Sequence, residues 1–246
     1  MTDDTRARPS RRTLLAGMAL MAAARAGLAR AEGAVMNNVV LLGDSIFDNK
    51  AYVGSGPDVI AQLRAALPPG WTATLNARDG STTSDIAYQL EKLPEGATHL
   101  VVSVGGNNAL EEKDYLDEKA SSVAEVLDKL SKIEGEFEAS YRAMLDSVLA
   151  AKLLTAVCTI YKARYQDPDQ RRIAATGLTV FNDVITREAF ARGLPLIDLR
   201  LIFSDDADYA NDVEPSVTGG AKIARAIATL LTTHDFAQSR SVVYVG

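Results

Sequence analysis

Thiol and imidazole side chains are scarce in this chain, which has one cysteine and two histidines among 246 residues. The single Cys158 excludes a disulfide within the chain and cannot form a zinc site alone. Because Cys158 lies in the apolar run LLTAVCTIY, we expect it to be a small buried hydrophobic residue. The lack of histidine also limits the choice of a general base, a role that histidine fills most often.

Basic residues are in the minority, with 26 Lys and Arg against 32 Asp and Glu and a formal net charge of −6. A nucleic-acid binder is therefore not expected, because neutralising phosphates requires clustered Lys and Arg. No linker, internal repeat or low-complexity tract interrupts the sequence, and residues 36–246 are expected to form one domain. No heptad pattern or exposed apolar strand stands out, so the sequence does not indicate an oligomeric state.

Long apolar runs are missing except near the N-terminus. Residues 13–24 form an apolar segment with Arg11-Arg12 before it and the small-residue pattern Ala29-Arg30-Ala31 after it. This segment is too short to cross a bilayer, and it resembles a cleavable export signal of the twin-arginine type. We expect residues 1–35 to be that signal and a short linker, so that the mature protein is periplasmic or secreted and has no membrane anchor. The alternative is translation from Met36, which would give a cytoplasmic protein.

The rest of the chain alternates short apolar runs with segments of helical spacing. Continuous apolar runs are typical of strands buried on both faces, and strands that alternate with helices form a parallel sheet covered on both sides. The expected fold class is therefore α/β. The predicted strands are the five segments 37–43, 71–77, 98–106, 153–161 and 194–200. The predicted helices are 57–67, 82–93, 109–151, 169–192 and 217–232.

The helical stretch 109–151 is long, and we expect a break near Gly135 because glycine lowers helix stability. Apolar residues at helical spacing predict the face that this stretch buries. They are Val123, Val126, Leu127 and Leu130 before the break, and Phe137, Tyr141, Leu145 and Val148 after it.

Small and polar residues follow three of the predicted strands. They are Gly43-Asp44-Ser45, Asp79-Gly80-Ser81 and Gly105-Gly106-Asn107-Asn108, and a later polar loop leads to Glu214. In open parallel sheets, ligands bind outside the carboxyl ends of the strands. We therefore expect these loops to converge on one site.

Ser45 is a candidate nucleophile for acyl transfer, which requires a nucleophile, a base and donors for an oxyanion. The backbone N–H groups of Ser45 and Gly80 and the side-chain amide of Asn107 would supply three such donors. The neighbouring polar residues expected in the same pocket are Asp44, Asp48 and Asn108.

These segments resemble the sequence blocks of the GDSL/SGNH hydrolase family. GDS, RDGSTTSD and GGNN follow the first three strands, EPSVTGGAKIA opens the last helix, and the resemblance spans Val39 to about Leu231. It implies a flavodoxin-like three-layer α/β/α sandwich, with Ser45 as nucleophile and the Ser45 N–H, Gly80 and Asn107 as oxyanion donors. It also implies hydrolysis of a small-molecule acyl ester, without a metal or another cofactor.

The last block departs from the family pattern, which has Asp-x-x-His at this point. Here Glu214 stands in the place of the histidine and Asn211 in the place of the aspartate, with Asp212 next to it. Glutamate is the weaker base at neutral pH, since the ordinary pKa values of Glu and His are about 4.3 and 6.5. Burial and the like charge of Asp212 are expected to raise the pKa of Glu214 and to narrow this gap.

Neither histidine is expected to replace the missing base. His99 starts the third predicted strand, at the opposite edge of the sheet from Ser45, and His234 follows the last predicted helix. Both are therefore expected to be surface or structural residues.

Three interpretations of the site stay open. In a working ester hydrolase, Ser45 acts with Glu214 as base and Asp212 near it, or with a base supplied differently. In a binding protein, the oxyanion pocket holds an acyl or carboxylate ligand without turnover. In a metal-assisted site, hard oxygen ligands hold a cation. The candidate ligands are Asp44, Asp48, Asp212 and Glu214.

Overall fold

The computed structural model describes residues 36–245, so the expected export signal at 1–35 lies outside the described residues. The strands form one parallel sheet in the order β2-β1-β3-β4-β5-β6. This confirms the predicted α/β fold with a parallel sheet. The strands are β1 (Asn37–Gly43), β2 (Trp71–Leu75), β3 (His99–Ser103), β4 (Leu154–Cys158), β5 (Leu196–Ile197) and β6 (Val243–Tyr244).

The sheet has six strands, so the prediction of five was wrong by one. β6 has two residues and pairs with β5 at the sheet edge, where the backbone N–H groups of Leu196 and Asp198 donate to the last segment of the chain. A segment this short shows no strand pattern in the sequence. The predicted strand 194–200 is also shorter than expected, because Asp198 caps the short helix α7 (Leu199–Ile202).

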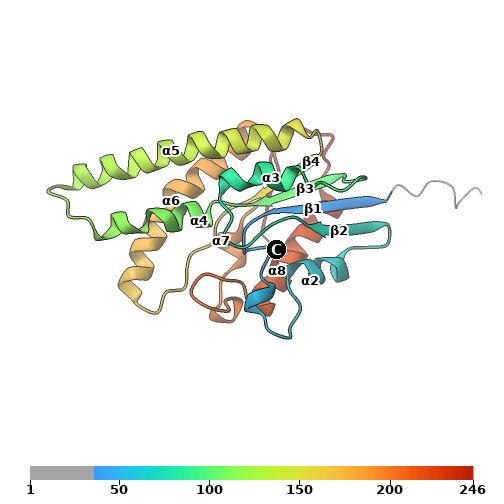
Figure 1. The fold of residues 1–246 in the computed structure, drawn as a ribbon, viewed down its shortest axis with the longest axis horizontal. Coiled ribbons are helices and arrows are strands. Elements are labelled where there is room, and N and C mark those ends of the chain that lie inside the picture. The colour runs from blue at the N-terminus through green and yellow to red at the C-terminus, as the bar shows by residue number, and fades with distance from the viewer. Residues whose placement is uncertain (1–35, 246) are drawn as a thin grey trace, which may run out of the picture. The chain divides into compact units, whose positions relative to one another are not determined.

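Helices cover both faces of the sheet and make a three-layer α/β/α sandwich (Figure 1). The longer helices are α2 (Val59–Ala66), α3 (Ile86–Leu90), α4 (Gly106–Glu111), α5 (Val123–Ala150), α6 (Pro168–Ala191) and α8 (Val217–Thr233). Short 3-10 helices are η1 (Lys50–Tyr52), η2 (Thr83–Asp85), η3 (Glu112–Asp117) and η4 (Asp206–Asp208). Successive strand residues point to opposite faces, so β1 buries Val39 and Leu41 under α2 and α8, and Val40 and Leu42 under α3, α5 and α6.

The long helical stretch is interrupted earlier than predicted. α5 runs through Gly135 without a break, and it begins at Val123, where the Ser122 side chain accepts from the Glu125 N–H. The second half of the predicted buried face is confirmed, since Phe137, Tyr141, Leu145 and Val148 are buried. The prediction for the first half is wrong at Val123, Val126 and Leu127, whose side chains are 43–76% exposed.

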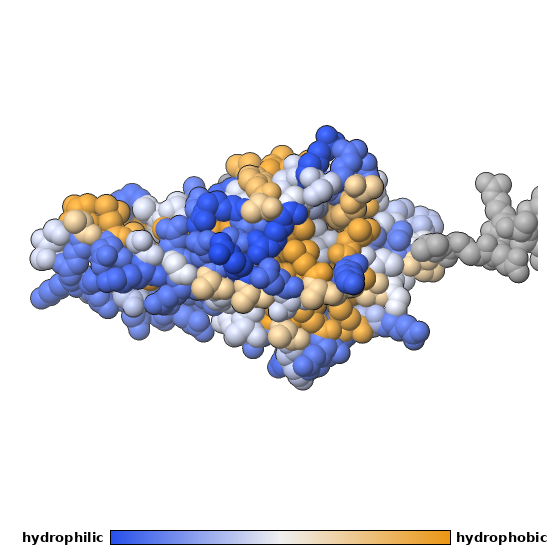
Figure 2. All heavy atoms as spheres, turned by 90° about the horizontal axis from the view of Figure 1, so that it is seen from above, coloured by the Kyte–Doolittle hydropathy of each residue, from blue (hydrophilic) through white to orange (hydrophobic). Residues whose placement is uncertain are grey.

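The reason for this difference is the position of α5 along the sheet. The first half of α5 extends past the strands (Figure 1), and apolar atoms are exposed at the end of the molecule where α5 begins (Figure 2). Helical spacing therefore marks an apolar stripe correctly, but the sheet is not long enough to cover all of it.

Within residues 36–245, no helix is both long enough and apolar enough to cross a bilayer.

Candidate active site

Three loops meet at the carboxyl ends of β1, β2 and β3, as expected for a parallel sheet. The loop after β1 passes close to β3, since a Cβ on Gly43 would lie 1.8 Å from the Ser103 carbonyl oxygen. Gly43 also has a φ of +140°, which disfavours any other residue. This glycine therefore allows the chain to turn and present Asp44 and Ser45 directly beyond the strand.

Ser45 and Glu214 form the centre of the site, although 169 residues separate them in the chain. The Ser45 Oγ donates a hydrogen bond of 3.0 Å to the Glu214 Oε1. Each residue is only 7% exposed. The structure thus places a carboxylate in hydrogen-bond reach of the candidate nucleophile, which is the contact that a general base requires.

The backbone around Glu214 is held by neighbouring polar side chains. The Asn211 Oδ1 accepts from the N–H groups of Val213 and Glu214, both at 2.9 Å. The Tyr161 hydroxyl donates to the Val213 carbonyl at 2.6 Å. Asn211 therefore positions Glu214 through the backbone.

Asn49, which no sequence motif singled out, joins the Ser45 loop to the Glu214 loop. Its Nδ2 donates to the Pro215 carbonyl at 3.1 Å, and its Oδ1 accepts from the Val59 N–H at 2.9 Å. Asn49 is fully buried. No sequence signal distinguishes it from an ordinary turn residue, because its partners come from distant segments.

Asp212 does not take the place expected for it. Within the described residues, no hydrogen bond joins its side chain to Glu214 or Ser45, and it does not line the cavity beside them. Its backbone carbonyl accepts from the Arg164 N–H at 2.6 Å. The like charge that acts on Glu214 comes instead from Asp79, in the loop after β2.

Burial, more than any other cause, raises the pKa of Glu214 from 4.5 to about 6. The hydrogen bond from Ser45 opposes this shift, and the charge of Asp79 adds to it. The Glu214 Oε2 is buried and has no hydrogen-bond partner among the described residues. The gap between this carboxylate and an ordinary histidine is thus about half a unit rather than two.

Asp44 is a second buried carboxyl group at the site. It is 2% exposed, and its Oδ1 accepts from the Ile46 N–H at 3.1 Å. Burial raises the pKa of Asp44 from 3.8 to about 7, with a smaller contribution from the charge of Glu214. Near neutral pH, Asp44 therefore exchanges a proton beside the candidate nucleophile.

Replacing Asp44 by asparagine is expected to stabilise the protein at alkaline pH. Because the folded-state pKa of Asp44 is raised from 3.8 to about 7, its contribution to stability is present below about pH 4 and is lost as the pH rises through about 7. Asp44→Asn should therefore raise the free energy of unfolding by about 2–4 kcal/mol at pH 8 and by little at pH 4. Urea unfolding at both pH values measures the difference.

The exposed Asp128 on α5 supplies the matched control, since Asp128→Asn removes the same charge from the surface. A gain for Asp44→Asn that is equal at pH 4 and pH 8 would contradict this account of Asp44.

The three groups expected to stabilise an oxyanion differ in their surroundings. Within residues 36–245, the backbone N–H groups of Ser45 and Gly80 donate to no protein acceptor. The Asn107 side-chain amide gives one of its two hydrogens to the Ser81 carbonyl at 2.9 Å. Gly80 has a φ of +80° in an exposed turn, which favours glycine at this position. Gly80 does not line the cavity, whereas Ser45 and Asn107 do.

Asp48 and Asn108, both expected in the pocket, connect the loops and do not line the cavity. The Asp48 Oδ2 accepts from the Asp79 N–H at 3.0 Å, and the Asn108 Oδ1 accepts from the Thr83 N–H at 3.1 Å. Gln89 adds a further connection, since it hydrogen-bonds both the N–H and the carbonyl of Gly43 at 2.8 Å. These bonds hold the three loops in a fixed arrangement.

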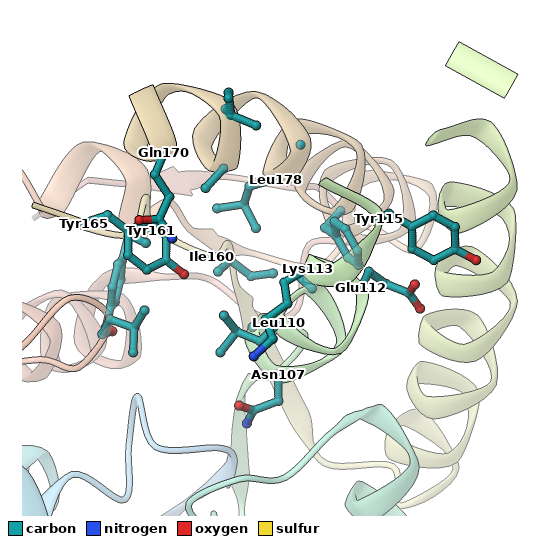
Figure 3. Close-up of a pocket in the computed structure, with 18 of the residues that line it drawn as sticks. Asn107, Leu110, Glu112, Lys113, Tyr115, Ile160, Tyr161, Tyr165, Gln170 and Leu178 are labelled. Atoms are coloured by element: carbon teal, nitrogen blue, oxygen red, sulfur yellow. The ribbon is translucent and has the colours of Figure 1, made fainter. Parts of the chain in front are cut away.

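A cavity of about 550 Å³ opens beside Ser45, Asp44 and Glu214. It runs between α4, η3 and α6, and its lining is mostly apolar. Figure 3 shows Leu110, Ile160 and Leu178 around this space, with Asn107 at one end of it. The apolar residues of its lining include Leu110, Leu130, Ile133, Ile160, Ile173, Leu178 and Phe181. A cavity of this kind can hold the apolar part of a ligand.

The other candidate groups are not assembled into a site. His99 is buried at the start of β3, where its ring lies 4.8 Å from that of Trp71, and His234 follows α8. Among residues 36–245, no group of three or more His, Cys, Asp or Glu side chains is arranged to hold a metal ion. The geometry therefore gives no support to the metal-assisted interpretation.

Comparisons with known proteins agree with this fold. A sequence model of the GDSL-like lipase/acylhydrolase family matches residues 41–221. No curated protein matches the chain. The extracellular lipase of Streptomyces rimosus is similar in structure, with a TM-score of 0.58 and 18% identity over 81% of this chain and 100% of the lipase.

Two further solved structures have the same fold. Phospholipase A1 of Streptomyces albidoflavus has a TM-score of 0.57 and 18% identity over 80% of this chain and 99% of its own. A catalytic mutant of an acetylxylan esterase from Geobacillus stearothermophilus has a TM-score of 0.56 and 18% identity over 82% of this chain and 97% of its own.

Proposed function

This chain belongs to the GDSL-like lipase/acylhydrolase family, and we propose that it hydrolyses carboxylic esters with Ser45 as nucleophile and Glu214 as general base. The observation that carries this proposal is the 3.0 Å hydrogen bond from the Ser45 Oγ to the Glu214 Oε1 in a buried site. Two unused N–H groups and the Asn107 amide lie on the loops that surround this pair.

Acylation begins with attack of the Ser45 Oγ on the ester carbonyl carbon, while its proton passes to the Glu214 Oε1. The carbonyl oxygen becomes an oxyanion, which the N–H groups of Ser45 and Gly80 and the Asn107 amide stabilise. Such donors are usually the largest contribution to acyl-transfer catalysis, at about 3–4 kcal/mol for one donor. The C–O bond then breaks, and Glu214 returns the proton to the leaving alkoxide, which departs as the alcohol.

Deacylation repeats these steps with water as the nucleophile. Glu214 takes a proton from water as the water attacks the acyl group on Ser45, and it returns a proton to the Ser45 Oγ when the carboxylic acid leaves. Glu214 becomes neutral when it accepts the proton, whereas histidine would become a cation beside the oxyanion. We therefore expect this site to be slower than a serine–histidine site.

The cavity defines the acyl group that the site accepts. It begins at Ser45 and is lined mostly by aliphatic and aromatic side chains of α4, α5 and α6. Burial of apolar surface contributes about 25 cal/mol per Å², so each additional methylene strengthens binding until the space is filled. The favoured substrates are therefore esters of apolar carboxylic acids.

Turnover of aryl esters is the direct test of this function. The purified protein should hydrolyse a p-nitrophenyl ester above the buffer rate, and kcat/KM should rise with pH through about 6 as Glu214 becomes ionised. We expect kcat/KM to rise rather than fall with pH because only the ionised form of Glu214 can accept the Ser45 proton. Absence of turnover in the folded protein would contradict the proposal and favour a protein that binds an acyl ligand.

A further inference from the structure

A group of acidic side chains lies near Glu214 but outside the cavity lining. The Tyr52 hydroxyl donates to the Asp79 Oδ2 at 2.6 Å, and the Asp79 N–H donates to the Asp48 Oδ2 at 3.0 Å. Asp48 lies in the turn that carries Ser45, since its N–H donates to the Asp44 carbonyl at 3.1 Å, and Ser45 in turn donates to Glu214. The charges of Glu214, Asp79 and Asp48 all raise the pKa of Tyr52. We refer to Asp48, Tyr52, Asp79 and Glu214 as the acidic face.

The acidic face contains a carboxylate oxygen that the protein leaves without a partner. The Glu214 side chain is buried beside the cavity, and its Oε2 accepts no hydrogen bond from residues 36–245. A buried polar atom without a partner is costly and requires an explanation, such as a ligand that completes the site. The second oxygens of Asp48 and Asp79 also accept no hydrogen bond within this part of the chain.

Neighbouring cationic side chains do not neutralise the acidic face. The Lys50 Nζ donates to the carbonyls of Gly54 and Gly56 at 3.0 and 2.9 Å. Lys113 lines the apolar cavity, where its side chain extends along Leu110 toward Asn107 (Figure 3). Over the described range, no Lys or Arg is among the groups that shift the pKa of Glu214 or Asp44.

We propose that the alcohol part of the ester carries a positive charge, as an ammonium or guanidinium group, which binds the acidic face while the acyl part occupies the cavity. The Tyr52 ring can contact this cation in addition to the carboxylates. The inference rests on the proposed function, because it assigns the acyl part of the ester to the cavity and the alcohol part to the acidic face.

The charge balance of a reaction in which Glu214, rather than a histidine, is the base supports this assignment. In the acylation step, the negative charge of Glu214 moves to the oxyanion, so the reacting centre has a charge of −1 before and after the proton transfer. A histidine base would supply a cation at that moment, and here the substrate supplies it. The cation therefore stabilises both the bound ester and the oxyanion that forms from it.

A matched pair of esters tests the proposal. Butyrylcholine carries a quaternary ammonium group, and 3,3-dimethylbutyl butyrate has a carbon in place of that nitrogen and is otherwise isosteric. At low salt, kcat/KM should be at least about tenfold higher for the cationic ester, as expected for a cleft lined by charges of one sign. The preference should fall as the salt concentration rises. Equal kcat/KM values for the two esters would overturn the proposal.

Asp79→Asn identifies the residues responsible. The introduced asparagine keeps an acceptor for the Tyr52 hydroxyl, so the variant should keep its fold, and the ratio of kcat/KM for the cationic ester to kcat/KM for the neutral ester should fall to near one. The control is Asp128→Asn on the exposed face of α5, which should leave the preference unchanged. A preference that survives in Asp79→Asn would contradict a cation site at the acidic face.

Binding to Ser45→Ala separates this inference from the proposed function. The variant cannot form an acyl-enzyme, so calorimetry with the two intact esters measures affinity without turnover. Tighter binding of butyrylcholine supports the cation site even if the wild-type protein hydrolyses neither ester, in which case only the proposed function fails. Equal affinities contradict the cation site, whatever the turnover of the wild-type protein.

Discussion

Replacing Ser45 by alanine should lower kcat for a p-nitrophenyl ester by about 10⁴-fold or more, the scale of loss seen when a serine nucleophile is removed. The reason is that no other hydroxyl takes its place. Within residues 36–245, the Ser45 Oγ is the group that donates to the Glu214 Oε1. Steady-state kinetics at pH 8 measures the effect, since Glu214 is ionised there according to its pKa of about 6.

Ser147→Ala is the matched control for this change. Ser147 is exposed on α5, and its hydroxyl donates only to the Ala143 carbonyl one turn earlier. It should therefore retain the full rate. If Ser45→Ala folds normally and keeps more than a tenth of the wild-type kcat, Ser45 is not the nucleophile.

Replacing Glu214 by glutamine should lower kcat by about 10³-fold, because general-base catalysis contributes about 10²–10⁴. Glutamine has almost the same shape and keeps an oxygen that can accept the Ser45 hydrogen bond, but it cannot take up the proton. The increase in rate through about pH 6, which we assign to Glu214, should also disappear. Measuring kcat/KM from pH 4 to pH 9 shows both effects.

Glu214→His should keep or raise the wild-type rate, since the imidazole becomes a cation beside the oxyanion when it accepts the proton.

The exposed Glu95, in the loop before β3, provides the control for Glu214→Gln, since Glu95→Gln removes a carboxylate far from Ser45. A wild-type pH profile in Glu214→Gln would show that Glu214 only supports the loop.

The meeting of Ser45 with Glu214 could be predicted from the sequence because topology alone brings them together. Strand ends in a parallel sheet share one edge, so short motifs after three strands and before the last helix must converge. The rise in the pKa of Glu214 was also expected, from burial and from the charge of Asp212; burial does raise it, but the like charge is that of Asp79.

The groups that surround Glu214 could not be predicted in this way, because they depend on distances between loops. Asp212 is two residues from Glu214 in the sequence, yet the charge that acts on Glu214 is that of Asp79, on a loop 135 residues earlier in the chain. Asn49 and Gln89 hold the loops through bonds to backbone groups of distant segments. A polar residue in a turn has no sequence pattern that names such partners.

Errors in the fold have a similar origin. Spacing showed that Val123 and Leu127 lie on the same stripe as Phe137, but only the structure shows that the sheet ends before it reaches the first half of α5. β6 pairs with β5 through the backbone, so its two residues need no apolar alternation. In both cases the structure depends on the position and extent of the neighbouring element, which the local sequence pattern does not show.

The claim that Ser45 is a nucleophile activated by Glu214 is tested most directly by covalent labelling. A fluorophosphonate probe should form an adduct that mass spectrometry maps to Ser45 in the wild-type protein. Labelling should be absent in Ser45→Ala and slower by about 100-fold or more in Glu214→Gln. An unlabelled Ser45 in the folded wild-type protein, or equally fast labelling in Glu214→Gln, would contradict the account.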